Sequence, residues 1–250
     1  MKKIQLATPY IDSDDLAAVS EALQSGWLTS GPRVKAFEEA FAKYVGTGFA
    51  VAVNSCTAAL HLSLAASGIG VGDEVIIPSL TFVATANAVL YQGARPVFAD
   101  IEEETLGLDS ESVRQRLTEK TRAIIPVHVA GHPADMAPIM EFAEEKGLIV
   151  IEDAAEALGA EYGGRRVGSF GIGCFSFYPS KNITTGEGGM ITTDTECVAE
   201  DSRAMRGHGI AKGTWRREEE GRPWERLQIC LGYNYRMTDF QGALGLSQLK

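Results

Sequence analysis

Short apolar segments of strand length alternate with segments of helical periodicity along most of this chain, from about residue 34 onward. Strands that are separated by helices pair mainly in parallel, and helices then cover both faces of the sheet. The alternation therefore predicts an α/β fold around a mostly parallel sheet. The predicted strands cover residues 49–53, 74–77, 96–99, 123–127, 148–151, 174–177 and 190–193, and the predicted helices cover residues 34–44, 57–66, 82–91, 110–117, 134–146 and 237–250.

The predicted elements follow one another without a repeat, a low-complexity tract or a linker. A chain of 250 residues is long enough for one large domain with a sizeable core. We expect residues 1–30 to form an N-terminal arm with a helix, and residues 31–250 to form the large domain. The last helical segment ends without the glycine, asparagine or proline that usually marks a helix end. We therefore expect the chain to stop before a further C-terminal domain.

Charge and hydropathy exclude several classes of partner. The formal net charge is −10, whereas binding to nucleic acid needs a basic face. No apolar run approaches the roughly 20 residues of a membrane-spanning helix. The lysines at positions 2 and 3 are not followed by the apolar segment of a signal peptide. We expect a cytoplasmic protein without a nucleic-acid or membrane partner.

Neither the cysteines nor the histidines form a convincing metal site. The four cysteines lie far apart without a C-x-x-C pair, which favours reduced thiols over a disulfide framework or zinc. His128 and His132 are four residues apart, a spacing that binds metal on a helix, but Gly131 and Pro133 disrupt any helix there. We predict no metal site, and the sequence assigns no role to His208.

The first candidate site is the strand-to-helix junction at residues 53–60, where Ser55 and Thr57 lie at the start of the helix. Free N–H groups and the positive helix end favour an anion at such a junction, and Thr57 could add its hydroxyl to a bound phosphate. The alternative is that Ser55 or Thr57 simply caps the helix.

The second candidate site is Asp153, which follows the apolar strand predicted at residues 148–151. Ligands of open α/β sheets bind beyond the carboxyl ends of the strands, so Asp153 could meet a cationic group. The alternative is again a helix cap, and Glu156, three residues later, fits a capping box.

The third candidate site is Lys181, on a glycine-rich loop between two predicted strands. A single loop lysine is usually solvated, but the other two motifs change this interpretation. A phosphate site, a carboxylate and a lysine are what pyridoxal phosphate requires: an anchor, a partner for the ring nitrogen, and an amine that forms an imine and moves protons.

Together these motifs resemble the DegT/DnrJ/EryC1/StrS family of sugar aminotransferases. The resemblance extends from residue 27 to the end of the chain and includes four further stretches. They are Trp-Leu-Thr-Ser-Gly-Pro at 27–32, Pro-Val-His at 126–128, Gly-His-Pro-Ala-Asp-Met at 131–136 and Gly-Tyr-Asn-Tyr-Arg-Met-Thr-Asp at 232–239. The resemblance implies the large domain of a fold-type-I pyridoxal-phosphate enzyme, with a mixed, mostly parallel sheet, helices on both faces, and a small C-terminal domain missing from this chain.

The family pattern implies a role for each residue around the cofactor ring. Lys181 matches the lysine that binds the cofactor covalently and is the expected catalytic residue. Asp153 matches the partner of the pyridine nitrogen, and Phe82 matches the aromatic residue that stacks on the ring. Glu156 takes the place of a polar residue, often glutamine or histidine, beside the ring hydroxyl.

A second group of residues matches positions around the cofactor phosphate. Cys56, Thr57 and Ala58 match the turn that holds the phosphate, and Ser176 matches a hydroxyl donor to it. Asn234 resembles a residue that reaches the phosphate across a dimer interface. The resemblance therefore implies a homodimer whose active sites need both subunits.

The implied activity is transfer of an amino group from glutamate to a nucleotide-linked keto sugar for polysaccharide biosynthesis. Asn-Tyr-Arg-Met at 234–237 resembles relatives that aminate C4, whereas relatives that aminate C3 tend to have Asn-Ser-Arg-Leu-Asp. A 4-keto-6-deoxyhexose is the expected acceptor. One alternative is a sugar dehydratase of the same fold, but such relatives have histidine in place of the lysine. The other is a non-catalytic regulatory protein that binds pyridoxal phosphate, although no DNA-binding segment is recognised.

Overall fold

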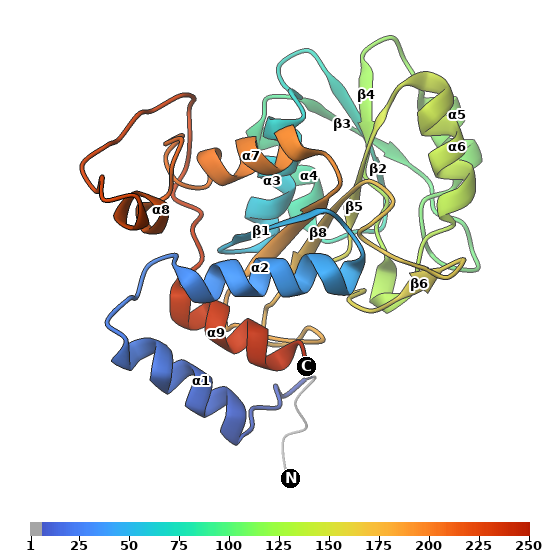
Figure 1. Ribbon diagram of the computed structural model, residues 1–250. Helices are drawn as coiled ribbons and strands as arrows, with labels where there is room; N and C mark the ends of the chain where they lie inside the picture. Colours follow the sequence, from blue (N-terminus) through green and yellow to red (C-terminus); the bar gives the residue numbers. More distant parts are fainter. Residues whose placement is uncertain (1–6) are drawn as a thin grey trace.

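The computed structural model describes residues 7–250, so the first six residues of the expected arm, with the two lysines, lie outside the described residues. A seven-stranded sheet forms the centre, in the order β1-β9-β8-β5-β4-β2-β3 (Figure 1). The strands of this sheet are β1 (Phe49–Val53), β2 (Glu74–Pro78), β3 (Arg95–Ala99), β4 (Thr121–Ile124), β5 (Ile149–Asp153), β8 (Ile172–Ser176) and β9 (Gly189–Thr193). A small antiparallel pair, β6 (Glu161–Tyr162) and β7 (Arg165–Arg166), lies apart from it.

The pairing confirms the predicted mixed, mostly parallel sheet. β9 runs antiparallel to β1 and β8, and the pairs among β8, β5, β4, β2 and β3 are parallel. The fourth strand ends earlier than residue 127, because Pro126 has no N–H to donate to the ladder. Its path still continues beside β5, where Val127 pairs with Asp153 as an isolated bridge. The end of β5 is thus held by main-chain hydrogen bonds.

Helices cover both faces of the sheet. They are α1 (Ser13–Gln24), α2 (Pro32–Val45), α3 (Cys56–Ala66), α4 (Val83–Tyr91), α5 (Ser110–Arg116), α6 (Met136–Lys146), α7 (Glu196–Met205), α8 (Thr214–Glu219) and α9 (Asp239–Gln248), with a 3-10 turn, η1, at Val129–Gly131. Helix α9 packs on both α1 and α2, and Figure 1 shows these three helices side by side. Among the described residues, no helix has the length and apolar character to span a membrane.

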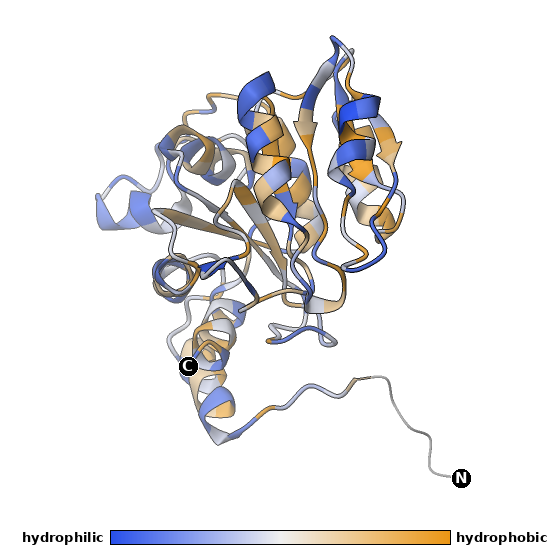
Figure 2. Ribbon diagram, turned by 90° about the vertical axis from the view of Figure 1, so that its right-hand side faces the viewer, coloured by the Kyte–Doolittle hydropathy of each residue, from blue (hydrophilic) through white to orange (hydrophobic). Residues whose placement is uncertain are grey.

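Successive residues of each strand face opposite sides of the sheet and contribute to different parts of the core. Val51 and Val53 pack with α3 and α4 on one side, whereas Ala50 and Ala52 pack with α2 on the other. All four are buried, which explains why the strands are continuous apolar runs. Figure 2 shows the hydrophobic strands enclosed by helices whose outer sides are more hydrophilic.

Candidate active site

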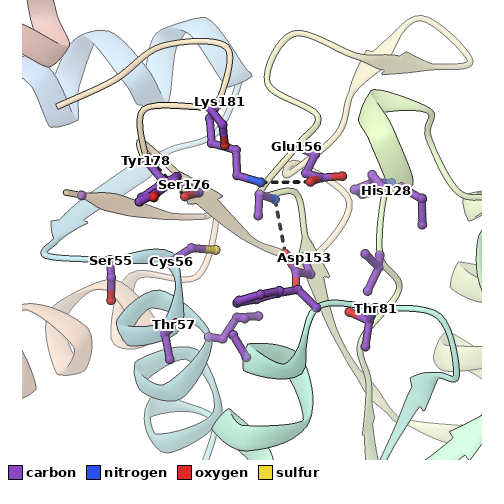
Figure 3. Close-up of a pocket in the computed structure, with 18 of the residues that line it drawn as sticks. Ser55, Cys56, Thr57, Thr81, His128, Asp153, Glu156, Ser176, Tyr178 and Lys181 are labelled. Carbon is purple, nitrogen blue, oxygen red and sulfur yellow. Dashed lines mark hydrogen bonds and ion pairs between the residues drawn. The ribbon is translucent and has the colours of Figure 1, made fainter. Parts of the chain in front are cut away.

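A cavity of about 640 Å³ opens where the carboxyl ends of β5 and β8 meet the N-termini of α3 and α4. This volume lies in the usual range for small-molecule sites. Seven of the nine expected site residues line the cavity: Cys56, Thr57, Phe82, Asp153, Glu156, Ser176 and Lys181. Figure 3 shows Lys181 and Glu156 on one side of it, Cys56 and Thr57 on another, and Asp153 between them. The tertiary structure therefore brings the three sequence motifs to one place.

The N-terminus of α3 forms one wall of the cavity. Ser55 is the N-cap, and its Oγ accepts a hydrogen bond of 3.1 Å from the N–H of Ala58. The capping interpretation is thus correct for Ser55, whereas Thr57 lies inside the helix and lines the cavity. Ala58 is buried behind this wall. A Cβ at Gly189 would lie 2.5 Å from the carbonyl carbon of Ser55, so β9 can approach the helix end only with glycine there.

Asp153 ends β5 on the floor of the cavity and is 5% exposed. Its Oδ2 accepts a 2.7 Å hydrogen bond from the hydroxyl of Thr85, which is itself 2.7 Å from the hydroxyl of Thr81. Burial raises the pKa of Asp153, because the low-dielectric surroundings disfavour the carboxylate. Asp153 Oδ1 also accepts a 3.3 Å hydrogen bond from the N–H of Ala155, so the carboxylate caps the turn that comes next, although that turn does not begin a helix.

Lys181 meets Glu156 across the opening of the cavity. The lysine Nζ donates to Glu156 Oε1 at 3.0 Å, and this hydrogen bond lowers the pKa of Glu156. Glu156 Oε2 accepts a second hydrogen bond, of 3.0 Å, from the N–H of Ala130, whose φ of 51° is unusual for a residue with a side chain. The carboxylate is therefore held from two sides, and it fixes where the lysine amine lies.

The loop that carries Lys181 is anchored by its own polar side chains. The Lys181 N–H donates to the carbonyl of Tyr178 at 2.9 Å. The Thr184 hydroxyl donates to the carbonyl of Phe177 at 3.0 Å, and the Thr184 and Thr185 side chains are buried. Gly186 has a φ of 79°, a left-handed conformation that glycine adopts without strain. The position of the lysine is thus determined by the loop as well as by Glu156.

Sequence reasoning missed Thr81, Thr85 and the His128–Glu152 pair. His128 lines the cavity, accepts at Nδ1 from the N–H of Ala134 at 3.1 Å, and lies 3.2 Å from Glu152 through Nε2. Because Nδ1 accepts, Nε2 carries the proton and donates to the buried carboxylate. Glu152 also accepts from the main-chain N–H groups of Gly168, Phe170 and Gly171. One signal in the sequence pointed to the buried His128–Glu152 pair. Glu152 precedes Asp153 in the same strand, so its side chain faces the opposite side of the sheet.

Asn234 lies outside this cavity and is exposed. It stands between Tyr233 and Tyr235, whose rings are stacked with centroids 5.0 Å apart. The Asn54 N–H donates to the carbonyl of Tyr235 at 2.9 Å, so the segment runs directly beside the junction that leads into α3. Within one chain, Asn234 is therefore not part of the cavity that the other expected residues line.

The residues of the cavity fit pyridoxal phosphate. Asp153 forms no ion pair among the described residues, so a bound cationic ring nitrogen would relieve the cost of burying its carboxylate. Lys181 supplies an amine within the same cavity, and the start of α3 with Thr57 and Ser176 supplies donors for a phosphate. Phe82, 75% exposed at the rim, offers an aromatic face to a planar ring.

Comparisons with known proteins agree with this arrangement. Residues 9–250 match the profile of the DegT/DnrJ/EryC1/StrS aminotransferase family. The spore coat polysaccharide biosynthesis protein SpsC of Bacillus subtilis is 49% identical over 97% of this chain and 62% of its own length. The chain thus spans less than two thirds of the length of this curated relative.

Solved structures share the fold. An aminotransferase from Psychrobacter cryohalolentis is 41% identical, with a TM-score of 0.91 over 97% of this chain and 62% of the other. A protein from Streptococcus pneumoniae, solved in its PLP-form, is 33% identical, with a TM-score of 0.90 over 99% of this chain and 66% of the other. The architecture is that of fold-type-I aminotransferases that use pyridoxal phosphate.

Proposed function

The chain belongs to the DegT/DnrJ/EryC1/StrS aminotransferase family, and on this premise we propose that it is an aminotransferase that uses pyridoxal phosphate. In this proposal it moves an amino group from glutamate to a nucleotide-linked 4-keto-6-deoxyhexose. The observation that carries the proposal is the convergence of Lys181, Asp153 and the start of α3 on one cavity. The name of the SpsC relative supports a role in polysaccharide biosynthesis.

Pyridoxal phosphate supplies an aldehyde that combines with amino groups and a ring that withdraws electrons from the neighbouring bonds. Asp153, buried at the floor, would favour a positive charge at the ring nitrogen. The start of α3, with Thr57 and Ser176, would hold the phosphate. Glu156 aims the Lys181 amine into the cavity, and that amine carries protons to and from the reacting carbon of the substrate.

The most specific part of the proposal is which carbon of the sugar, C3 or C4, carries the keto group. Moving the carbonyl from C4 to C3 shifts the reacting carbon by about one bond and turns the ring, which requires different pocket walls. Tyr235, part of the motif associated with C4, lies 3.2 Å through its hydroxyl from His61 Nδ1 and does not line the cavity of its own chain. In our proposal the motif therefore acts by shaping the segment around Asn234.

We expect the enzyme to aminate a nucleotide-linked 4-keto-6-deoxyhexose faster than the matched 3-keto compound with glutamate as donor. The measurement is the initial rate of amino-sugar formation with each acceptor at equal concentration. A second donor, aspartate, serves as the control for the choice of glutamate. Faster amination of the 3-keto compound would show that the assignment to C4 is wrong.

We further propose a homodimer in which Asn234 serves the cofactor phosphate of the neighbouring subunit. Two inactive variants should then complement each other. Asn234→Ala and Lys181→Ala chains, mixed and allowed to exchange, form hybrid dimers with one intact site, so about one quarter of the wild-type activity should return. The measurement is turnover at limiting cofactor before and after exchange. If Asn234 acts within its own chain, mixing restores nothing.

A further inference from the structure

A second cavity, of about 440 Å³, lies beside the start of β1, at the edge of the sheet, and shares no lining residue with the active site. The start of β1, the end of α7, α2 and the segment leading into α8 surround it, and Figure 1 shows these elements close together. Two carboxylates, Glu38 and Glu39, line it. Six cationic side chains also line it: Lys35, Arg203, Arg206, Lys212, Arg216 and Arg236.

This concentration of positive charge is unusual in a chain whose formal net charge is −10. Protein partners account for five of the six cations. Lys35 pairs with Glu39, Arg206 with Glu38, and both Lys212 and Arg216 with Glu220. Arg203 donates to the carbonyl of Ala50 at 3.2 Å.

Arg236 is the exception. Its guanidinium has no hydrogen-bond or ion-pair partner among the described residues, although the side chain is partly buried. A Cβ at Gly207 would lie 4.0 Å from Arg236 Nη1, so the guanidinium is close to the end of α7. Burial and the nearby guanidinium of Arg206 lower the pKa of Arg236. Two like charges therefore face the same cavity, and only one of them is neutralised.

A phosphate group matches what this cavity lacks. Guanidinium groups bind phosphate oxygens with two parallel hydrogen bonds, and a multiply charged anion between Arg206 and Arg236 would remove their repulsion. The rings of Phe49 and Trp215 also line the cavity and can stack against a flat group. We propose that this cavity is a second site, separate from the active site, that binds a phosphorylated anion through Arg236.

Binding can be measured on enzyme saturated with pyridoxal phosphate, so that the phosphate-binding start of α3 is filled. The probe is inorganic pyrophosphate, followed by titration calorimetry and by the fluorescence of Trp215, which lines the cavity. We expect saturable binding that weakens as the salt concentration rises. Uridine diphosphate should displace pyrophosphate, and tighter binding of the nucleotide than of pyrophosphate identifies a nucleotide as the source of the phosphate.

Arg236→Gln should weaken pyrophosphate binding by about tenfold or more, as expected when a charged hydrogen-bond donor is lost. Arg122→Gln is the matched control, because Arg122 is exposed and pairs with Asp73 far from this cavity. An equal loss in both variants, or binding only in cofactor-free enzyme, would overturn the proposal. A second outcome would also overturn the proposal: sedimentation could show that Arg236→Gln dissociates the proposed dimer while its monomers bind pyrophosphate normally. The cavity would then hold a carboxylate of the partner subunit instead of a phosphate.

Discussion

Lys181→Ala should abolish turnover, with a loss of about 10⁴-fold or more, the upper end of what a positioned proton-transfer group contributes. The residue is 3.0 Å from Glu156 and supplies the amine of the cavity. The rate of amino transfer and the visible absorption of the bound cofactor are measured together. Both should change, because in the proposed function the same amine would bind the cofactor covalently and move the proton.

Lys181→Arg is the matched control for this experiment. It keeps a positive charge beside Glu156, so the pairing and the fold should survive, but a guanidinium does not form the covalent bond. We expect it to be as inactive as Lys181→Ala while unfolding at a temperature near that of the wild type. Wild-type turnover in either variant would remove Lys181 from the mechanism.

Asp153→Asn should lower turnover by about 10²–10³-fold, the range seen when one preorganised electrostatic contact is lost. The amide keeps the shape of the side chain and a hydrogen bond to Thr85, but it no longer favours a protonated ring nitrogen. Cofactor should still bind through its phosphate. Asp153→Glu, which keeps the charge, should be milder, and near-normal turnover of Asp153→Asn would reduce Asp153 to a structural residue.

The same substitution should stabilise the cofactor-free protein at neutral pH. Burial raises the pKa of Asp153 in the folded state, so its contribution to stability is fully present below the unfolded pKa and is lost as the pH rises through the folded pKa. Asparagine has no such loss. Thermal unfolding of cofactor-free Asp153→Asn and wild type should therefore differ most at pH 7, and the difference should shrink toward pH 4. A difference that is independent of pH would contradict this explanation.

Local patterns determined the architecture and the chemical types in the site. The apolar runs are continuous because both faces of each strand are buried, so the sequence predicted the strands to within a few residues. The strand at residues 123–127 was predicted too long, because Pro126 ends the regular ladder although the chain continues in the same direction. Asp153 and the start of α3 were recognisable because each stands at an end of a strand or a helix, and Lys181 because it lies on a glycine-rich loop between two strands.

Partners that are distant in the sequence were decided only by the tertiary structure. The Asp153–Thr85 hydrogen bond joins residues 68 positions apart, and the Lys181–Glu156 pair joins residues 25 apart. The spacing of Glu156 from Asp153 fitted a capping box, but no helix begins at Asp153. The Glu156 carboxylate instead accepts hydrogen bonds from the Lys181 amine and the N–H of Ala130. Periodicity describes neighbours along one element, whereas these contacts depend on the order in which the strands assemble, which places Asp153 beside β8 and α4. The sequence alone thus determined which groups the site contains, and the assembled sheet decided which of them meet.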